Sequence, residues 1–295
     1  MKILLTGANG FVGGYIKQQL KVTELPSSIN ICDEESLNVY VSENIPDCVI
    51  HLAAVSFVPE SFKYPRNTFD VNFYGTYNLL SVLEKAGFNG KFLYVSSSDV
   101  YGLVKKDEQP VSELQLTKPR SPYAVSKVAA EAICYQYSTL SKFECIIARP
   151  FNHIGPGQSE SFVISNFAKQ LVEIKLGLRE SKLYVGDIDV YRDFTDVRDV
   201  VSAYKLLLGD GVNSQIYNIC SGTGWKIRDL IEIMIEQLNV DVDIIVDKNR
   251  LRKSEQRYVS GDCTKLKENT DWIQKIDISD SITDILKYWE NYLNE

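Results

Sequence analysis

The first twenty residues of the chain constrain its fold more than any other stretch. Residues 2–6 form a short strand-like run, Gly7, Gly10 and Gly13 follow it, and a helical pattern continues through Leu20. A strand, a glycine turn and a helix in this order let backbone amides and a helix N-terminus face a diphosphate. The first two glycines permit the turn and close approach of a ligand, and the third permits close packing of the helix on the strand. A glycine-rich turn without a ligand is the alternative.

Strand-like and helical runs alternate through the first half of the chain. Strand patterns cover residues 47–54, 91–95 and 143–148, and helical patterns cover 66–86 and the stretch that begins at Pro122. Such alternation is typical of a parallel sheet. Later in the chain it breaks, and we expect an α/β fold: a Rossmann-type doubly wound parallel sheet with a small mixed C-terminal substrate lobe. The dinucleotide-binding domain is expected at residues 1–152 with return segments at about 191–222, and the lobe at about 153–190 and 223–278.

The second strand–helix unit is unusually short. Only residues 21–32 separate the first helix from Asp33, which is typical of a helix cap. No clear acidic residue ends a second strand to bind a ribose diol, and no arginine stands there for a 2′-phosphate. Glu24, Ser27 and Ser28 are the remaining candidates. The sequence therefore does not distinguish NAD from NADP.

Charge and composition exclude several classes of protein. The 295 residues carry a formal net charge of −7, which argues against a generic nucleic-acid surface or anionic-membrane surface. No apolar run reaches the length of a membrane span, and we find no signal peptide. The six cysteines lack metal-ligand spacing, and two histidines argue against a zinc site. We therefore expect a cytoplasmic protein with no metal site.

A tyrosine and a lysine stand four residues apart at the start of a predicted helix. Pro122 suits the first turn of a helix, which then places Tyr123 and Lys127 on one face. An ammonium beside a phenol favours the ionised phenol and lowers its pKa, so the pair could transfer a proton near neutral pH. A surface tyrosine packed on a lysine stem is the alternative. The same spacing recurs at Tyr101 and Lys105, which we expect in a loop.

Small and polar residues follow two of the predicted strands, at the edge where ligands bind a parallel sheet. Leu52, Ala53 and Ala54 would let a cofactor lie close, after a histidine expected to be a core residue. The segment Ser96–Asp99 offers hydroxyls for a substrate oxygen, or for capping a turn. Further along, Arg192, Arg252 and Lys253 are candidates for binding a diphosphate, with a solvated surface role as the alternative.

Together these features resemble the extended short-chain dehydrogenase/reductase superfamily over essentially the whole chain. The matching marks are the glycine turn from Thr6 to Gly13, His51-Leu-Ala-Ala54, Asn72, Ser97 before Val100-Tyr-Gly102, Tyr123-x-x-x-Lys127, Arg149-Pro150 with Asn152, and Arg192-Asp193. Most such enzymes act on nucleotide-diphosphate sugars, whose nucleotide is held by the C-terminal lobe.

Within this superfamily, three segments resemble GDP-4-keto-6-deoxy-D-mannose reductases, which make GDP-D-rhamnose. They cover residues 151–158, 191–199 and 217–222. A fourth, Arg252-Lys-Ser-Glu255, resembles that family's Arg-Pro-x-Glu nucleotide-contacting segment, with lysine in place of proline. The resemblance implies an enzyme that uses NADPH or NADH, binds a GDP-linked sugar, and forms a homodimer through the helices carrying Asn72 and Tyr123.

The resemblance also implies residue roles. Tyr123 would protonate the alkoxide at the sugar C4, Ser97 would bond the same oxygen, and Lys127 would hold the nicotinamide ribose and lower the Tyr123 pKa. Asp99 completes the catalytic candidates. The implied cofactor-binding residues are Gly7, Gly10, Phe11, Val12, Gly13, Ile31, Leu52, Ala53, Ala54, Asn72, Tyr123 and Lys127. The implied substrate-binding residues are Ser97, Ser98, Asn152, Arg192, Arg252 and Glu255.

Other functions remain open on the same residues. Asp99 stands where nucleotide-sugar 4,6-dehydratases of this superfamily carry the acid that eliminates water, one methylene shorter than their usual glutamate. GDP-mannose dehydratases typically read Asn-His-Glu-Ser-Pro where this chain reads Asn152-His-Ile-Gly-Pro, which favours a reductase. A 4-epimerase is a further possibility. A non-catalytic protein that senses NAD(P) belongs to a different class, but such relatives commonly lose the tyrosine or lysine that this chain keeps.

Overall fold

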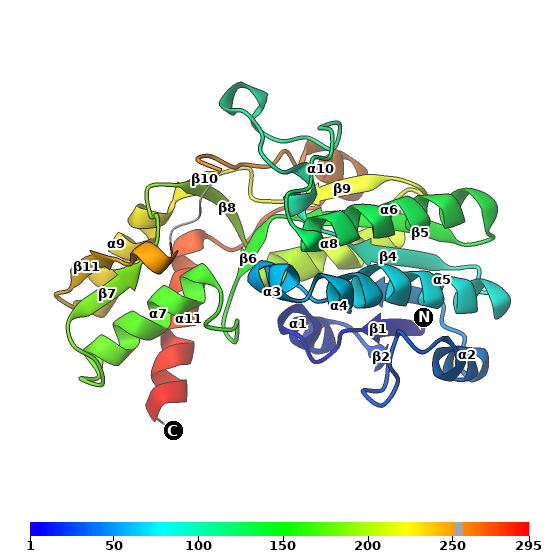
Figure 1. The fold of residues 1–295 in the computed structure, drawn as a ribbon, viewed down its shortest axis with the longest axis horizontal. Coiled ribbons are helices and arrows are strands. Elements are labelled where there is room, and N and C mark those ends of the chain that lie inside the picture. The colour runs from blue at the N-terminus through cyan, green and yellow to red at the C-terminus, as the bar shows by residue number, and fades with distance from the viewer. Residues whose placement is uncertain (251–255, 295) are drawn as a thin grey trace.

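The chain folds into a helix-covered sheet and a smaller second part beside it (Figure 1). The computed structural model describes residues 1–250 and 256–294. Its central sheet has six parallel strands in the order β2-β1-β3-β4-β5-β9. These strands are β1 (Ile3–Thr6), β2 (Val22–Glu24), β3 (Cys48–His51), β4 (Lys91–Val95), β5 (Glu144–Pro150) and β9 (Ile216–Ile219). The predicted Rossmann-type fold is confirmed.

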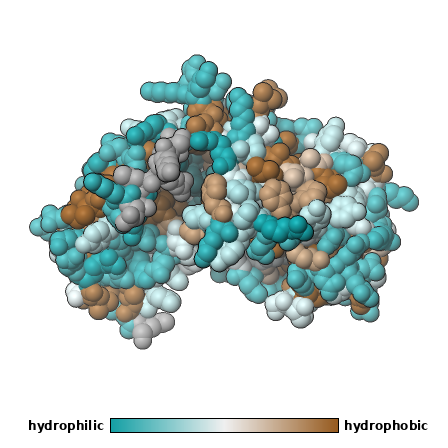
Figure 2. Space-filling view, in the orientation of Figure 1, coloured by the Kyte–Doolittle hydropathy of each residue, from teal (hydrophilic) through white to brown (hydrophobic). Residues whose placement is uncertain are grey.

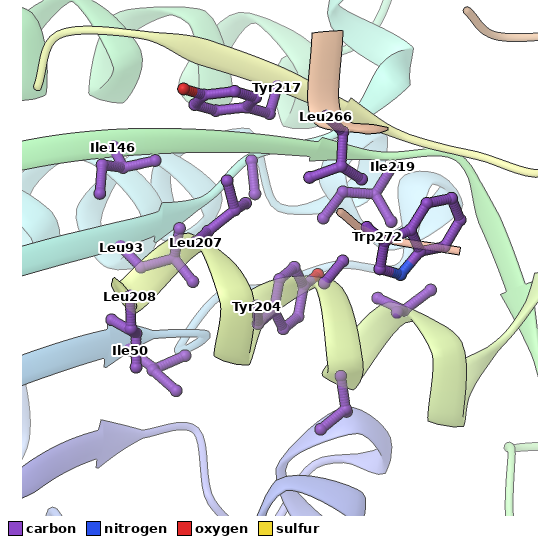
Figure 3. Packing of buried hydrophobic residues seen from close by; sticks show 14 of the residues in the cluster. Ile50, Leu93, Ile146, Tyr204, Leu207, Leu208, Tyr217, Ile219, Leu266 and Trp272 are labelled. Atoms are coloured by element: carbon purple, nitrogen blue, oxygen red, sulfur yellow. The ribbon is translucent and has the colours of Figure 1, made fainter. Parts of the chain in front are cut away.

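Helices cover both faces of this sheet, as the burial of the central strands β1, β3 and β5 requires. One face packs against α1 (Phe11–Gln19) and α8 (Val197–Asp210), whose side chains Tyr204, Leu207 and Leu208 lie against the sheet (Figure 3). The other face packs against three helices. They are α2 (Glu34–Glu43), α5 (Gly75–Lys85) and α6 (Pro122–Leu140).

The second part has a hydrophobic core of its own, in which three helices pack against a pair of parallel strands. These elements are α7 (Val163–Lys175), α9 (Ile227–Leu238), α11 (Ile278–Asn294), β7 (Lys182–Val185) and β11 (Asp243–Val246). A three-stranded sheet, β10-β8-β6, lies between this core and the central sheet (Figure 1). Its strands are β6 (Asn152–Ile154), β8 (Tyr191–Asp196) and β10 (Gly224–Lys226).

The division of the chain into two domains stays a prediction. The short helix α10 (Thr264–Thr270) packs against α8 and β9, and Trp272 belongs to the core of the central sheet. Part of the segment expected in the substrate lobe therefore lies with the sheet. Among the helices that the structure describes, none is long and apolar enough to cross a membrane.

Two local expectations need correction. The short second unit does contain a strand, β2, which pairs with β1 and ends at the acidic Glu24, where no clear acidic end was expected. Glu24 forms an ion pair with Lys17 at 3.2 Å.

The helix predicted at 66–86 is divided into α4 (Pro65–Phe69), a π-helical turn at Asp70–Tyr74, and α5. The remaining helical elements of the described residues are the short helix α3 (Val58–Lys63) and three 3₁₀ turns, at Ser98–Tyr101, Lys106–Glu108 and Lys248–Arg250.

Candidate active site

A cavity of about 1280 Å³ opens at the carboxyl ends of the central strands, between the sheet and the second part. This is where doubly wound sheets bind ligands. Most of the predicted site residues line it. They are Gly7, Gly10, Phe11, Val12, Gly13, Leu52, Ala53, Ala54, Ser97, Ser98, Asp99, Tyr123, Lys127, Asn152 and Arg192.

The glycine turn between β1 and α1 forms one end of this cavity. Gly7 adopts a φ of +70°, and a Cβ there would lie 2.8 Å from the Ala53 nitrogen. A Cβ on Gly13 would lie 2.4 Å from the Gly7 carbonyl oxygen, so the helix can pack this closely on the turn only without a side chain. The N-terminus of α1 and its free amides therefore face the cavity, which suits a diphosphate.

Tyr123, Ser97 and Asp99 meet at the end of β4. Ser121 caps α6 by accepting a hydrogen bond from the Ala124 amide at 3.1 Å, and this places Tyr123 in the first turn. Ser97 caps the 3₁₀ turn after β4, where its Oγ accepts from the Asp99 amide at 3.1 Å. The Ser97 hydroxyl also hydrogen-bonds Tyr123. The structure thus brings together three of the four predicted catalytic residues.

Lys127, the fourth, lies one turn beyond Tyr123 on α6 and is buried. Its Nζ donates a hydrogen bond to the Val95 carbonyl at 2.7 Å and lies 4.9 Å from the centroid of the Tyr94 ring. Burial lowers the pKa of Lys127 to about 8. The negative charge of Glu131 raises this pKa and so opposes the effect of burial.

The pKa of Tyr123 is raised, whereas a lowering by Lys127 was expected. Burial raises the pKa of Tyr123 well above its usual value, the charge of Asp99 raises it further, and the hydrogen bond with Ser97 opposes both. Lys127 Nζ lies 5.9 Å from the Tyr123 ring centroid and donates to Val95 instead. Spacing on a helix predicts adjacency, but it does not reveal the burial that dominates this pKa. Tyr123 therefore holds its proton at neutral pH.

Two predicted cofactor contacts lie behind the wall of the cavity. The Asn72 side chain is buried. It hydrogen-bonds the Val55 backbone and donates to Ser126 Oγ at 2.9 Å. Ser126 Oγ in turn donates to the Tyr123 carbonyl at 2.7 Å, so Asn72 supports the first turn of α6. Ile31 packs under Gly75, and neither it nor Asn72 lines the cavity. Contact of Ile31 and Asn72 with a cofactor stays a prediction.

The substrate side of the cavity is lined by residues of β6 and β8. Asn152 Nδ2 donates to the Asp193 carbonyl at 3.1 Å, and Arg192 Nη1 donates to the Gln256 carbonyl at 2.7 Å. Both predicted substrate contacts are therefore positioned by protein groups while they face the cavity. Arg252 and Glu255, like the neighbouring Lys253, lie outside the described residues.

Sequence reasoning missed the role of Asp193. This fully buried carboxylate accepts hydrogen bonds from Ser221, Gly222 and Gly261, at 2.7 to 3.0 Å. Burial raises the pKa of the Asp193 carboxyl, and the hydrogen bonds that it accepts lower it by less. It ties β8, which carries Arg192, to the end of β9 and to the chain that follows the 251–255 segment. Its place in the Arg-Asp motif was the only signal in the sequence.

Tyr204 was also missed. The side chain comes from α8, is fully buried and lines the cavity, and its hydroxyl has no hydrogen-bond partner among the described residues (Figure 3). A buried hydroxyl without a partner is costly. The fit of a nucleotide cofactor rests instead on the glycine turn, where Gly7 and Gly13 leave no room for a Cβ.

Two further expectations hold. His51 is a core histidine, with Nδ1 2.6 Å from Thr6 Oγ1 and Nε2 3.0 Å from Thr76 Oγ1, and burial lowers its pKa to about 3. Tyr101 and Lys105 do not share a helix face, because Gly102 ends the 3₁₀ turn between them. The Tyr101 hydroxyl donates to Asn218 Oδ1 at 2.6 Å. Three or more potential metal ligands do not gather anywhere in the described part of the chain.

A family model described as GDP-mannose 4,6 dehydratase matches residues 26–285. The chain belongs to this family. It is 44% identical to a GDP-6-deoxy-D-mannose reductase from Pseudomonas aeruginosa over 301 aligned positions, which cover 100% of this chain and 99% of the relative. A GDP-mannose 4,6-dehydratase from Vibrio cholerae is 28% identical, with 87% of this chain and 76% of the relative covered.

The solved structures agree with these family relations. The structure of RMD from Pseudomonas aeruginosa complexed with NADPH superposes with a TM-score of 0.93 at 43% identity, covering 99% of each chain. The resemblance to the extended short-chain dehydrogenase/reductase superfamily that the motifs indicated is confirmed.

Proposed function

We propose that the chain reduces the C4 keto group of GDP-4-keto-6-deoxy-D-mannose to give GDP-D-rhamnose, with NADPH or NADH as reductant. The observation that carries this proposal is the 44% identity, over the full length of both chains, to a GDP-6-deoxy-D-mannose reductase. The cavity agrees with it, because Tyr123, Ser97 and Lys127 line the same space as the glycine turn.

The chain offers a binding site for the cofactor along the ends of β1 and β3. Backbone amides at the start of α1 hold the diphosphate, and Leu52, Ala53 and Ala54 form the adjoining wall. Lys127, which lines the same cavity, would hold the nicotinamide ribose. When bound, NAD(P)H supplies the hydride that reduces the C4 carbonyl. The similar reductase from Pseudomonas aeruginosa is complexed with NADPH, which supports the phosphorylated cofactor as one of the two candidates.

Tyr123 supplies the proton. Because burial and the charge of Asp99 raise its pKa, the phenol is protonated when substrate arrives. The Tyr123 hydroxyl donates this proton to the C4 oxygen as negative charge develops there, and the Ser97 hydroxyl donates a hydrogen bond to the same atom. Arg192 and Asn152 bind the substrate on the opposite side of the cavity, and Arg252 and Glu255 are proposed to contact its nucleotide.

The deciding experiment offers the enzyme two keto sugars. Purified protein is incubated with NADPH or NADH and with GDP-4-keto-6-deoxymannose or its dTDP-glucose-derived counterpart, and the loss of absorbance at about 340 nm is followed. We expect oxidation of the cofactor with the GDP-linked sugar alone, and formation of GDP-D-rhamnose by chromatography. Oxidation with the dTDP-linked sugar alone would contradict the proposed nucleotide, and none with either would contradict the reductase.

A 4,6-dehydratase is the second candidate, because Asp99 lies at the end of β4 within the cavity. Its distinguishing outcome is loss of water from GDP-mannose without net use of cofactor. The charge of Asp99 acts on the Tyr123 pKa, which gives Asp99 a function in a reductase as well. The lower identity to the Vibrio cholerae dehydratase, 28%, favours the reductase.

We further propose that the chain forms a homodimer through α5, α6 and the π-helical turn. Hydrophobic residues gather over these helices on the face shown in Figure 2. Tyr74, Tyr77, Val125 and Tyr135 are among the large side chains exposed there, by 40 to 56%. Aromatic residues exposed on adjacent helices are typical of an interface. This dimer would place Asn72 and the first turn of α6 directly beneath the contact between subunits.

Charges placed on this face should separate the subunits. The double variant Tyr74→Asp, Tyr135→Asp would place two carboxylates on each side of the interface, and we expect it to elute as a monomer by light scattering at micromolar concentration. The control is Leu114→Asp, which adds one charge at a side chain that is 93% exposed in the 102–120 loop. It should leave the dimer intact. A monomeric wild-type protein would contradict the proposal.

A further inference from the structure

A buried ion pair lies directly behind the proposed proton-transfer residues. Glu131 follows Lys127 by four residues on α6, as Lys127 follows Tyr123, so the three side chains form one stripe along the helix. Arg149 of β5 binds Glu131 through two hydrogen bonds, from Nε to Oε1 at 2.9 Å and from Nη2 to Oε2 at 2.6 Å. The side chains of Glu131 and Arg149 are only 7% and 4% exposed.

Two side chains, those of Arg149 and Ser96, fix the position of the Glu131 carboxylate. Ser96 Oγ, at the end of β4, donates to Glu131 Oε1 at 2.5 Å. The Arg149 guanidinium stacks 4.8 Å from the Tyr101 ring centroid, whose hydroxyl is held by Asn218. The pair therefore joins helix α6 to β4 and β5 at the strand ends where the cavity begins.

Glu131 also carries the negative charge that acts on Lys127. The groups that face Lys127 are Tyr123, Glu131 and Cys134 on its own helix, the Tyr94 ring on β4 and His51 on β3. Burial raises the pKa values of Tyr94, Tyr123 and Cys134 and lowers that of His51, which leaves all four neutral at pH 7. Among the described residues that act on Lys127, Glu131 is the one held in an ion pair, with Arg149 at 2.6 Å.

We propose that Glu131, held by Arg149 and Ser96, is a positioning residue for the proposed reduction, whose carboxylate keeps the buried Lys127 ammonium protonated at neutral pH. The expected effect of Glu131 on turnover rests on the proposed function. Its effect on the charge of Lys127 does not. An ammonium in an apolar interior loses its proton readily without a nearby anion. Lys127 must keep its charge to hold a ribose hydroxyl and to stabilise the phenolate that Tyr123 becomes after it gives up its proton.

The charge effect can be measured without any substrate. The protein is labelled with ¹³C at lysine Cε, and the Lys127 resonance is assigned by its loss in Lys127→Met and followed with pH. Wild type should titrate near the pKa of about 8 expected for this lysine. In Glu131→Gln the midpoint should fall by about one pH unit, since removing an anion favours the neutral amine. An unchanged midpoint in the folded variant would overturn the proposal.

A matched control removes a carboxylate from a different arginine pair. Asp196 is fully buried and binds Arg198 at 2.8 Å, away from the cavity lining. Asp196→Asn should lower thermal stability and leave the Lys127 midpoint unchanged. Where Glu131→Gln does not fold, because it leaves Arg149 unpaired, the double variant Glu131→Gln, Arg149→Gln removes both charges together. It should also lower the midpoint, and an unchanged midpoint there overturns the proposal equally.

Turnover supplies the second readout. At pH 8 a fall of one unit in this pKa reduces the protonated fraction from about a half to about a tenth, so kcat with the GDP-linked keto sugar should fall about fivefold. The loss should shrink at pH 6.5, where Lys127 stays mostly protonated in both proteins. If wild-type protein reduces no keto sugar, the proposed function fails, while the lysine titration still decides the role of Glu131.

Discussion

Replacing Tyr123 with phenylalanine is expected to lower kcat for the keto sugar by about 10²–10⁴, the usual contribution of a general acid. The ring that packs at the start of α6 is kept, and only the hydroxyl that donates the proton is lost. Binding of NADPH, measured by the change in its fluorescence, should stay within a few-fold of wild type. The Ser97 hydroxyl would still donate a hydrogen bond to the C4 oxygen, but no general acid would remain to transfer a proton to that oxygen.

The control for this variant lies on the same helix. Tyr137 is 7% exposed and lies away from the cavity lining, so Tyr137→Phe removes a hydroxyl from α6 without touching the site. Its kcat should match wild type. Turnover by Tyr123→Phe within tenfold of wild type would contradict the assignment of Tyr123 as proton donor. A variant that loses cofactor binding as well would point instead to a structural role for the phenol.

The sequence predicted those parts of the fold and site that depend on neighbours along the chain. The glycine turn and the pair Tyr123 and Lys127 are each encoded within a few residues, and all of them line the cavity. The strand β2 has only three residues, too few for a periodic pattern to indicate. Its acidic end, Glu24, was therefore weighed only as a remaining candidate for the ribose.

What the sequence left out depends on contacts between distant segments. Asp193 accepts hydrogen bonds from amides up to 68 positions away, so its place in the Arg-Asp motif was the only local indication of its role. The sign of the Tyr123 pKa shift was wrong for a related reason, because burial outweighs the effects of neighbouring charges there. An ion pair of Glu131 could have been predicted from the sequence, because this carboxylate lies on the buried stripe of α6, where a charge needs a partner.

Replacing Gly13 with alanine is expected to abolish cofactor binding at micromolar concentration and to lower the free energy of unfolding by about 1–3 kcal/mol or more. The added Cβ would lie 2.4 Å from the Gly7 carbonyl oxygen and 2.7 Å from that of Ala8. Both contacts are with backbone, which cannot move aside as a flexible side chain can. The turn and the N-terminus of α1 must therefore shift, and with them the amides that bind a diphosphate. Fluorescence titration with NADPH and thermal unfolding measure the two effects.

The next residue provides the control, because the same substitution there meets no obstacle. A Cβ on Gly14 would have nothing within 4 Å, and residue 14 lies inside α1. Alanine is favoured over glycine in a helix by about 1 kcal/mol, so Gly14→Ala should raise the unfolding free energy and leave cofactor binding intact. Helix propensity favours alanine equally at positions 13 and 14. If Gly13→Ala lowers the free energy of unfolding while Gly14→Ala raises it, the difference is due to the contact between helix and turn. Equal effects of the two substitutions, on stability and on NADPH binding, would contradict the close approach of α1 to the glycine turn.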